Sequence, residues 1–210
     1  MKHRSLGCLF EVLETLLLTL IVFLVIQLFV AQPYQIQQQS MENSLLPNQY
    51  VLVDKLTPHF DDFHRGDIVV FSPPPGWASD AAGTPFIKRV IGIAGDTVDI
   101  HDGFVFVNGT KLDEPYLYQD QPTVPADPKT HTWKIAAGQL FVLGDHRADS
   151  KDSRAFGAIS KSTVIGRAWL RYWPFDQFGI LPSATQPAAS TASTASTASP
   201  APPASPTAKP

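Results

Sequence analysis

The chain has 210 residues, which is enough for one compact domain of ordinary size with appendages. Its formal net charge of −3 gives no electrostatic case for nucleic acid as a partner. The single cysteine, Cys8, excludes an intramolecular disulfide, and no Cys–His cluster has the spacing of metal ligands. We therefore expect no metal, no cofactor and no nucleic acid in the function.

The N-terminal region predicts a membrane anchor in residues 9–31, preceded by a short cytoplasmic segment, residues 1–8. As a helix, the 23 residues of this apolar run reach about 35 Å, which exceeds a hydrocarbon core of about 30 Å. Lys2 and Arg4 precede the run, so the positive-inside rule keeps the N-terminus in the cytoplasm. The expected protein crosses the cell membrane once, with everything after the run outside the cytoplasm.

Two other interpretations of the apolar run are less favourable. A cleaved signal peptide would have a shorter apolar core, and a cut after Ala31 would place Phe29 where a small residue is wanted. A buried helix of a soluble protein would need an apolar partner helix, and the rest of the chain offers none of comparable length. An uncleaved anchor is therefore the prediction.

After the apolar run, the hydrophobic pattern changes to alternation with period two, which is typical of strands. Two dipeptides, Asp102-Gly103 and Asn108-Gly109, supply the positive φ angles that tight hairpins need. No later segment has the 3.6-residue period of a helix, so the domain should be mainly β. The predicted strands are residues 50–56, 66–71, 86–93, 97–100, 104–107, 110–112, 139–145 and 163–174.

The β-rich extracytoplasmic domain is expected to span residues 32–182. Within it, residues 101–136 are interpreted as a variable hairpin and loop insertion, because 113–132 are polar and contain prolines. Residues 183–210 consist almost wholly of Ala, Ser, Thr and Pro, which cannot bury enough apolar area to offset the entropy of ordering. We predict that this C-terminal segment is a disordered tail.

Ser40, in the stretch QQQSMENSLL, is the candidate nucleophile. A serine hydroxyl needs a base to take its proton, and the Gln, Met and Asn side chains beside it cannot serve. Lys88, in the apolar stretch FIKRVIGI, is the candidate base, because burial lowers the pKa of a lysine. Two plainer interpretations compete. Ser40 could be a turn or capping residue, and Lys88 could extend to the surface beside Arg89.

A third polar stretch, LGDHRADSKDSRAFG at 143–157, directly follows a predicted strand. A buried neutral lysine needs an oriented hydrogen-bond partner, which Ser150 or Ser153 could supply. Asp152 and Arg154 could form a local brace.

The neighbours Asp145 and His146 invite a Ser-His-Asp triad with Ser40. This interpretation is rejected, because Ser40 lacks the Gly-x-Ser-x-Gly elbow of such hydrolases. His146 is expected to be an ordinary loop residue.

The three stretches, in this order between about Ile36 and Pro174, resemble the type I signal peptidases, which cut signal peptides from exported proteins. SMENSLL is similar to the family's nucleophile box, FIKRVIGIAGDTV to its lysine box and GDHRADSKDSRAFG to its last box. The resemblance implies a membrane-bound serine endopeptidase with a mainly β catalytic domain, Ser40 as nucleophile and neutral Lys88 as general base.

The resemblance also implies roles around this pair. Ser150 would orient the lysine, Asp152 and Arg154 would form a structural ion pair, and the backbone N–H of Ser40 with Gln38 would form the oxyanion hole. Members of the family cut exported preproteins after small residues in an Ala-x-Ala pattern, so such preproteins are the implied substrates. The membrane anchor implies membrane lipid as a second partner. By matching positions, the substrate pocket would be lined by Tyr34, Ile36, Met41, Leu45 and Ile87.

The chain departs from the family pattern at several positions. Gln38 stands for the usual Ser or Gly, Asn43 for Pro, Asn48-Gln49 for Gly-Asp, and His146 and Asp149 for asparagines.

Two rival functions were weighed against the peptidase. A self-cleaving Ser/Lys repressor domain is disfavoured by the anchor and by the lack of a DNA-binding helix pair. An anchored, non-catalytic β domain that binds signal peptides or partners is disfavoured because it has no need of a neutral lysine.

Overall fold

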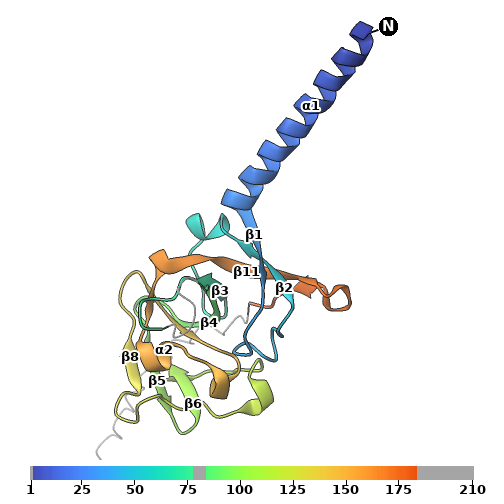
Figure 1. Cartoon of the computed structure of the whole chain (residues 1–210). Coiled ribbons are helices and arrows are strands. Elements are labelled where there is room, and N and C mark those ends of the chain that lie inside the picture. The colour runs from blue at the N-terminus through green and yellow to red at the C-terminus, as the bar shows by residue number, and fades with distance from the viewer. Residues whose placement is uncertain (1, 78–83, 184–210) are drawn as a thin grey trace, which may run out of the picture.

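The computed structural model describes residues 2–77 and 84–183. The predicted disordered tail lies outside the described residues from residue 184 onward. A long N-terminal helix projects from a β-rich body (Figure 1). The mainly β class with an N-terminal apolar helix is therefore confirmed.

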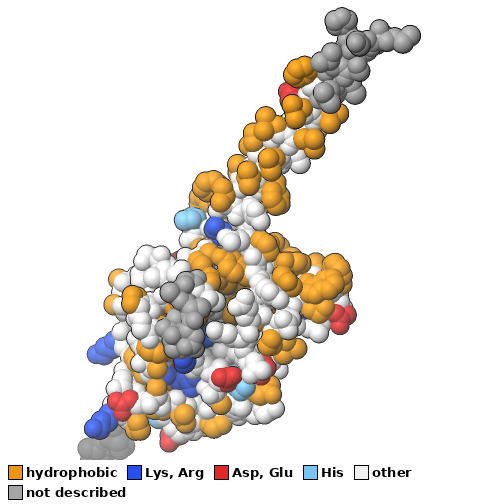
Figure 2. Space-filling view, in the orientation of Figure 1, with side chains coloured by type: hydrophobic (Ala, Val, Ile, Leu, Met, Phe, Trp, Pro, Cys, Tyr) orange, Lys and Arg blue, Asp and Glu red, His pale blue; other side chains and the backbone are white. Residues whose placement is uncertain are grey.

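The projecting helix begins as α1, Lys2–Val25, and ends with one π-helical turn, η1, Ile26–Val30. Its Phe10–Val30 segment has a mean hydropathy of 2.5, and its side chains are unburied, so it is a candidate membrane span (Figure 2). The strand β1, Ala31–Gln35, follows without a linker. The helix thus ends one residue before the predicted end of the anchor, because Ala31 already pairs in a sheet.

The body contains a large antiparallel sheet in the order β1-β2-β11-β3-β4-β9-β10, with β12 paired to β11. The bounds of its other strands are β2 Tyr50–Asp54, β3 Ile68–Phe71, β4 Phe86–Gly92, β9 Gln139–Leu143, β10 Ile159–Ser160, β11 Val164–Trp173 and β12 Gly179–Ile180. This order brings β4 between β3 and β9, at the centre of the site described below.

All the predicted strands are present, with ends that differ by at most two residues from the prediction. Pattern reasoning missed β1, which contains Pro33. Proline is tolerated there because β1 lies at the edge of the sheet, where one side of the strand has no ladder to complete. It also missed β8, Thr132–Lys134, which pairs with β5 inside the supposed loop insertion.

A smaller antiparallel sheet has the order β7-β6-β5-β8, with β5 at Thr97–His101, β6 at Phe104–Val107 and β7 at Thr110–Lys111. The two predicted hairpin turns are confirmed. Their residues have positive φ angles, which are 52° at Asp102, 82° at Gly103, 53° at Asn108 and 77° at Gly109. These angles match the hand of tight turns that fit the twist of the strands.

The helices of the body are short, because the sequence there lacks a helical period. They are η2 Thr57–His59, η3 Tyr118–Asp120, η4 Arg147–Asp149, α2 Ser153–Phe156, η5 Lys161–Thr163 and η6 Phe175–Gln177. Two of them, η4 and α2, follow β9 in the polar stretch 143–157.

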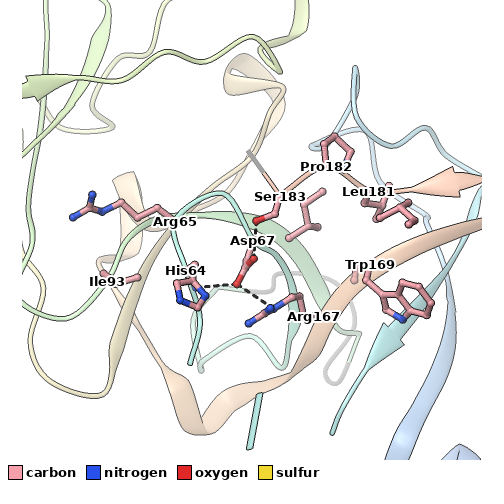
Figure 3. Close-up of a pocket in the computed structure, with 12 residues that line it drawn as sticks. His64, Arg65, Asp67, Ile93, Arg167, Trp169, Leu181, Pro182 and Ser183 are labelled. Carbon is pink, nitrogen blue, oxygen red and sulfur yellow. Dashed lines mark hydrogen bonds and ion pairs between the residues drawn. The ribbon is translucent and has the colours of Figure 1, made fainter. Parts of the chain in front are cut away.

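A cavity of about 580 Å³ lies between β3, β11 and the segment after β12 (Figure 3). Its charged groups are largely paired. Asp67 accepts hydrogen bonds from the His64 backbone N–H at 2.8 Å and from Ser183 Oγ at 2.9 Å. Arg167 Nε lies 3.1 Å from the same carboxylate. None of the predicted site residues lines this cavity, so the candidate site lies elsewhere.

Candidate active site

Ser40 begins a tight turn that connects the segment after β1 to β2. Within the turn, the N–H of Glu42 donates to the carbonyl of Gln39 at 2.9 Å, and the N–H of Leu45 donates to that of Met41 at 2.8 Å. Met41 and Leu45 are fully buried in the apolar cluster against β2, β3 and β11. They therefore support the turn from beneath, whereas the resemblance placed them in the substrate pocket.

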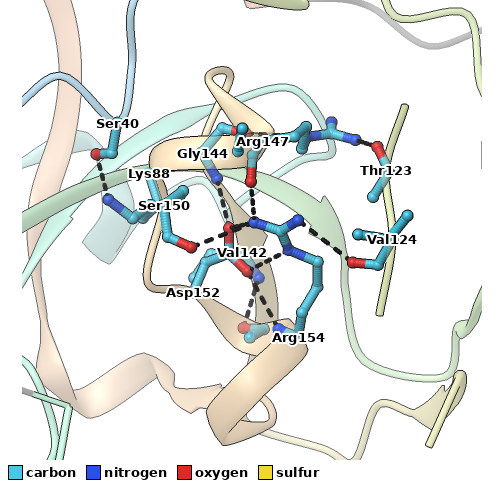
Figure 4. A network of polar contacts seen from close by, with 12 residues as sticks. Ser40, Lys88, Thr123, Val124, Val142, Gly144, Arg147, Ser150, Asp152 and Arg154 are labelled. Carbon is cyan, nitrogen blue, oxygen red and sulfur yellow. Dashed lines mark hydrogen bonds and ion pairs between the residues drawn. The ribbon is translucent and has the colours of Figure 1, made fainter. Parts of the chain in front are cut away.

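Lys88 lies in the middle of β4 and faces this turn. Its Nζ is 2.5 Å from the Oγ of Ser40 (Figure 4). The exposed fraction is 1% for Lys88 and 4% for Ser40, which excludes a lysine that extends to the surface. Burial lowers the pKa of Lys88 to about 8, although the negative charge of Asp152 opposes part of this shift. At pH 7 about a tenth of Lys88 is then neutral and able to accept a proton, and this share rises with pH.

The polar stretch after β9 is held by the ion pair of Asp152 and Arg154. The Arg154 Nε donates to Asp152 Oδ1 at 2.8 Å, and its Nη2 donates to Oδ2 at 2.9 Å (Figure 4). Nη2 of the same guanidinium also donates to the backbone carbonyls of Arg147 at 2.7 Å and Ser150 at 3.2 Å. This brace fixes the path of the loop that carries Ser150.

The two candidate lysine partners, Ser150 and Ser153, have different environments. Ser153 Oγ is buried and accepts a hydrogen bond from the N–H of Val142 at 3.0 Å, so it serves strand β9. Ser150 Oγ is buried and hydrogen-bonds to no group in the part of the chain that the structure describes. It makes no hydrogen bond with Lys88, but of the two hydroxyls it is the one free to orient a neighbour.

Gly144 allows the loop to lie against the nucleophile turn. A Cβ atom at this position would overlap with the Oγ of Ser150 and with the backbone carbonyl of Ser40. Next to it, the backbone N–H of His146 donates to the same Ser40 carbonyl at 3.1 Å. Ser40, Lys88 and Ser150 are thus brought together from three separate parts of the chain.

Sequence reasoning missed a buried ion pair beneath the site. Arg89 and Asp145 are 1% and 0% exposed, and they form two hydrogen bonds, of 2.9 and 2.7 Å. Ser44, in the nucleophile turn, donates to Asp145 at 2.5 Å and accepts from Arg89 at 2.9 Å. The ring of Tyr116 lies 4.0 Å from the guanidinium carbon of Arg89.

A second missed pair lies in the segment between the two sheets. Arg147 and Glu114 form an ion pair of 2.5 Å with side chains that are 1% and 6% exposed. Thr123 Oγ1 accepts a further hydrogen bond from Arg147. Residues 113–132 were expected to be a polar surface excursion, but they contribute this buried pair. The signal in the sequence was Arg147, the first of the two arginines in the stretch 143–157, which a buried loop could not leave unpaired.

A cavity of about 180 Å³ lies beside the dyad, between β1, the segment before Ser40 and the start of β4. The predicted pocket residues Tyr34, Ile36 and Ile87 line it, and so does Gln38. The full lining is Pro33, Tyr34, Gln35, Ile36, Gln37, Gln38, Val70, Thr84, Pro85 and Ile87. Ile87 and Gln38 precede Lys88 and Ser40 by one and two residues, whereas Ser40 and Lys88 themselves do not line the cavity.

No group of three or more His, Cys, Asp or Glu side chains among the described residues is placed to hold a metal ion. The chemistry that the arrangement offers is that of a hydroxyl hydrogen-bonded to a buried amine. A neutral amine at this distance is within reach to accept the hydroxyl proton, which turns serine into a nucleophile.

Residues 9–173 match the model of the family described as signal peptidase, peptidase S26. The chain belongs to the S26 signal peptidase family. It is therefore an enzyme that processes signal peptides by serine protease chemistry.

Two relatives, compared by sequence, agree with this assignment. A signal peptidase I of Leptolyngbya laminosa is 37% identical over 175 residues, covering 82% of this chain and 84% of the relative. A signal peptidase IB of Staphylococcus aureus strain COL is 32% identical, covering 80% and 93%. A crystal structure of a signal peptidase I from Enterococcus faecalis V583 is 30% identical, with a TM-score of 0.41, covering 51% of this chain and 97% of that chain.

Proposed function

We propose that Ser40 is the nucleophile and Lys88 the general base of this signal peptidase. The observation that carries the proposal is the 2.5 Å separation of Lys88 Nζ from Ser40 Oγ in a buried setting. Burial lowers the pKa of Lys88 to about 8, which puts the neutral base within reach at working pH. Burying a lysine beside a serine lowers the stability of the folded protein. A protein that only binds peptides gains nothing from this arrangement, so an enzyme is favoured.

The reaction then takes two steps. Neutral Lys88 accepts the proton of Ser40 as Oγ attacks the carbonyl carbon of the scissile peptide bond. The resulting lysine ammonium gives the proton to the leaving amine, so the mature protein departs and the signal peptide stays as an ester on Ser40. Water, deprotonated by Lys88, attacks the ester and regenerates the serine hydroxyl.

The developing oxyanion needs a donor aimed at it. The backbone N–H of Ser40 donates to no group among residues 2–77 and 84–183, so we assign it this role. Gln38 is exposed on the wall of the 180 Å³ cavity, and its side-chain amide is our second candidate donor. Ser150 is assigned to the orientation of Lys88 after the base has been protonated. Removal of one oxyanion donor typically lowers the rate by about 10²–10³.

The substrates are assigned as exported preproteins that are cut after small side chains. The cavity beside the dyad is small, and the side chains of Tyr34, Ile36 and Ile87 give it apolar walls. Apolar walls of this kind favour an apolar group such as a methyl over a charged side chain, which would lose its hydration there. This supports cleavage after an Ala-x-Ala pattern.

Membrane lipid is the other proposed partner, with the N-terminus cytoplasmic and the peptidase domain outside. The candidate span Phe10–Val30 leads directly into β1. Hydrophobic side chains continue from the helix onto the adjoining face of the domain (Figure 2). Large exposed side chains gather at the end of β11 and after it, namely Trp169, Trp173, Phe175, Phe178 and Ile180. An exposed patch of this kind marks a surface that contacts a membrane or another protein.

The test is cleavage of a preprotein with an Ala-x-Ala site by the full-length enzyme in detergent or lipid. Ser40→Ala and Lys88→Ala should each abolish cleavage after the final alanine. Lys161→Ala is the matched control, because Lys161 is paired with Asp62 on the surface and should leave the rate unchanged.

Equal cleavage by all of these proteins would refute the assignment of the dyad. A wild-type enzyme that binds several preproteins but cuts none of them would instead favour the non-catalytic binding domain.

A further inference from the structure

The turn that carries Ser40 is held to two neighbouring segments, the chain before η3 and the loop after β9, by contacts that lie outside the dyad. Asn43, in the turn, donates from Nδ2 to the carbonyl of Leu117 at 3.1 Å. Its φ of 85° is a value that proline cannot adopt. The turn therefore has its own attachments in this chain.

A second attachment joins Glu42 to His146. The imidazole Nδ1 of His146 lies 3.0 Å from the Oε2 of Glu42. The orientation of the imidazole leaves Nδ1 without a hydrogen bond among the described residues, so the two groups are joined by packing and by an ion pair when the imidazole is protonated. The two side chains are 14% and 16% exposed, so the contact is largely closed off from water. The ring of Tyr118 lies against the imidazole, with centroids 4.3 Å apart, and limits its movement.

His146 also touches the nucleophile itself, through its backbone. Its N–H donates to the carbonyl of Ser40 at 3.1 Å, while its side chain holds Glu42, two residues further along the turn. One residue of the loop thus fixes the turn at two points. A shift of the Ser40 backbone would move Oγ relative to Lys88 Nζ, because the lysine belongs to the rigid strand β4.

We propose that Glu42 and His146 form a positioning pair that keeps Ser40 in reach of Lys88. The inference rests on the proposed dyad and deepens it. Neither side chain touches the reacting atoms, so removal of the pair should lower kcat rather than substrate binding. Because a displacement of 1 Å costs about 100-fold in rate, a partial displacement should cost about tenfold.

The experiment is a double-mutant cycle on the full-length enzyme, with kcat and KM measured on one preprotein well below the unfolding temperature. We expect Glu42→Ala and His146→Ala each to lower kcat about tenfold with KM within about twofold of wild type. The double variant should be no slower than either single variant, because the same contact is lost in all three.

A matched control exists on the small sheet. His101 Nδ1 lies 2.9 Å from Asp102 Oδ2, and the imidazole stacks on Phe106 at 4.1 Å, so the pair has the same chemistry. His101→Ala should leave kcat unchanged.

Three results would overturn the inference. The first is that both single variants keep the wild-type kcat. The second is that the two losses of kcat multiply in the double variant. The third is a change confined to KM or to thermal stability. A wild-type enzyme without activity would overturn the dyad, and the positioning pair with it. An active wild type with unaffected variants would overturn the positioning pair alone.

Discussion

The carboxylate of Asp145 and the guanidinium of Arg89 form a buried, two-point ion pair that joins the loop after β9 to β4. Arg89 follows the proposed base directly, and Asp145 also accepts a hydrogen bond from Ser44 of the nucleophile turn. The pair therefore connects the elements that carry Ser40 and Lys88, without taking part in the chemistry.

Asp145→Ala should destabilise the folded protein by about 3–5 kcal/mol, because it leaves the buried charge of Arg89 without its partner. Denaturant unfolding followed by tryptophan fluorescence would measure the loss. Asp62→Ala, at the exposed pair with Lys161, is the control and should cost less than about 1 kcal/mol. Equal losses in the two variants would contradict the argument.

Activity should rise with pH, because the neutral form of Lys88 is the reactive base. With a pKa of about 8, kcat/KM should increase about tenfold per pH unit well below pH 8 and level off above it. The profile is to be measured on one preprotein between pH 5 and about pH 9.5. A flat profile across this range would show that Lys88 is not the titrating base.

Stability should depend on the same group, with a defined sign. The pKa of Lys88 is lowered from 10.5 to about 8 on folding, so between these values the unfolded chain binds more protons than the folded one. Stability should therefore increase as pH rises through this window. Lys88→Met removes the titratable group, and its stability relative to wild type should be greatest below pH 8 and shrink toward pH 10.5. A difference that is constant with pH would contradict the buried-lysine account.

Gly144→Ala should lower kcat by about 100-fold, because the added methyl group must displace Ser150 and the Ser40 carbonyl by about 1 Å to reach ordinary contact distances. Gly179→Ala is a suitable control, since a Cβ there meets nothing within 4 Å. Steady-state kinetics of both variants would test the expectation. Full activity of Gly144→Ala would mean that the loop and the turn can separate without harm.

The two serines after β9 should give opposite results when each is changed to alanine. Ser150→Ala should lower kcat and leave the unfolding midpoint unchanged, because its hydroxyl supports no other described group. Ser153→Ala should lower stability by about 1 kcal/mol with little effect on kcat, because it leaves the N–H of Val142 unsatisfied. Parallel kinetics and thermal unfolding would separate the roles, and a reversed pattern would show that Ser153 is the lysine partner.

The sequence was sufficient for most of the fold class, and it named Ser40 and Lys88 as candidates, which the structure places within hydrogen-bond distance. Period-two alternation located the strands, and the Asn-Gly and Asp-Gly dipeptides located two hairpins, because these signals are local. The order of strands was not predictable, since β11 inserts between β2 and β3 through contacts far apart in the chain.

The environment of the site was harder to predict than its residues. Arg89 was taken as a possible surface neighbour of Lys88, because its partner Asp145 lies 56 residues away and no local pattern links them. Met41 and Leu45 were assigned to the pocket; both are fully buried in the apolar cluster, and neither is among the residues that line the 180 Å³ cavity. Whether an apolar side chain faces a cavity or a core depends on how the turn packs, which a single sequence does not encode locally.

The junction of helix and sheet has a consequence for how a substrate must arrive. The N–H of Lys55 donates to the carbonyl of Val30 at 2.9 Å, and its Nζ donates to that of Leu28 at 2.8 Å, so the end of the helix is bound to the chain that follows β2. With this connection, an anchor in a bilayer would hold Ser40 at a fixed distance from the lipid surface. Flexible residues inserted after Val30 would loosen that setting, and the accuracy of the cleavage position should suffer before its speed.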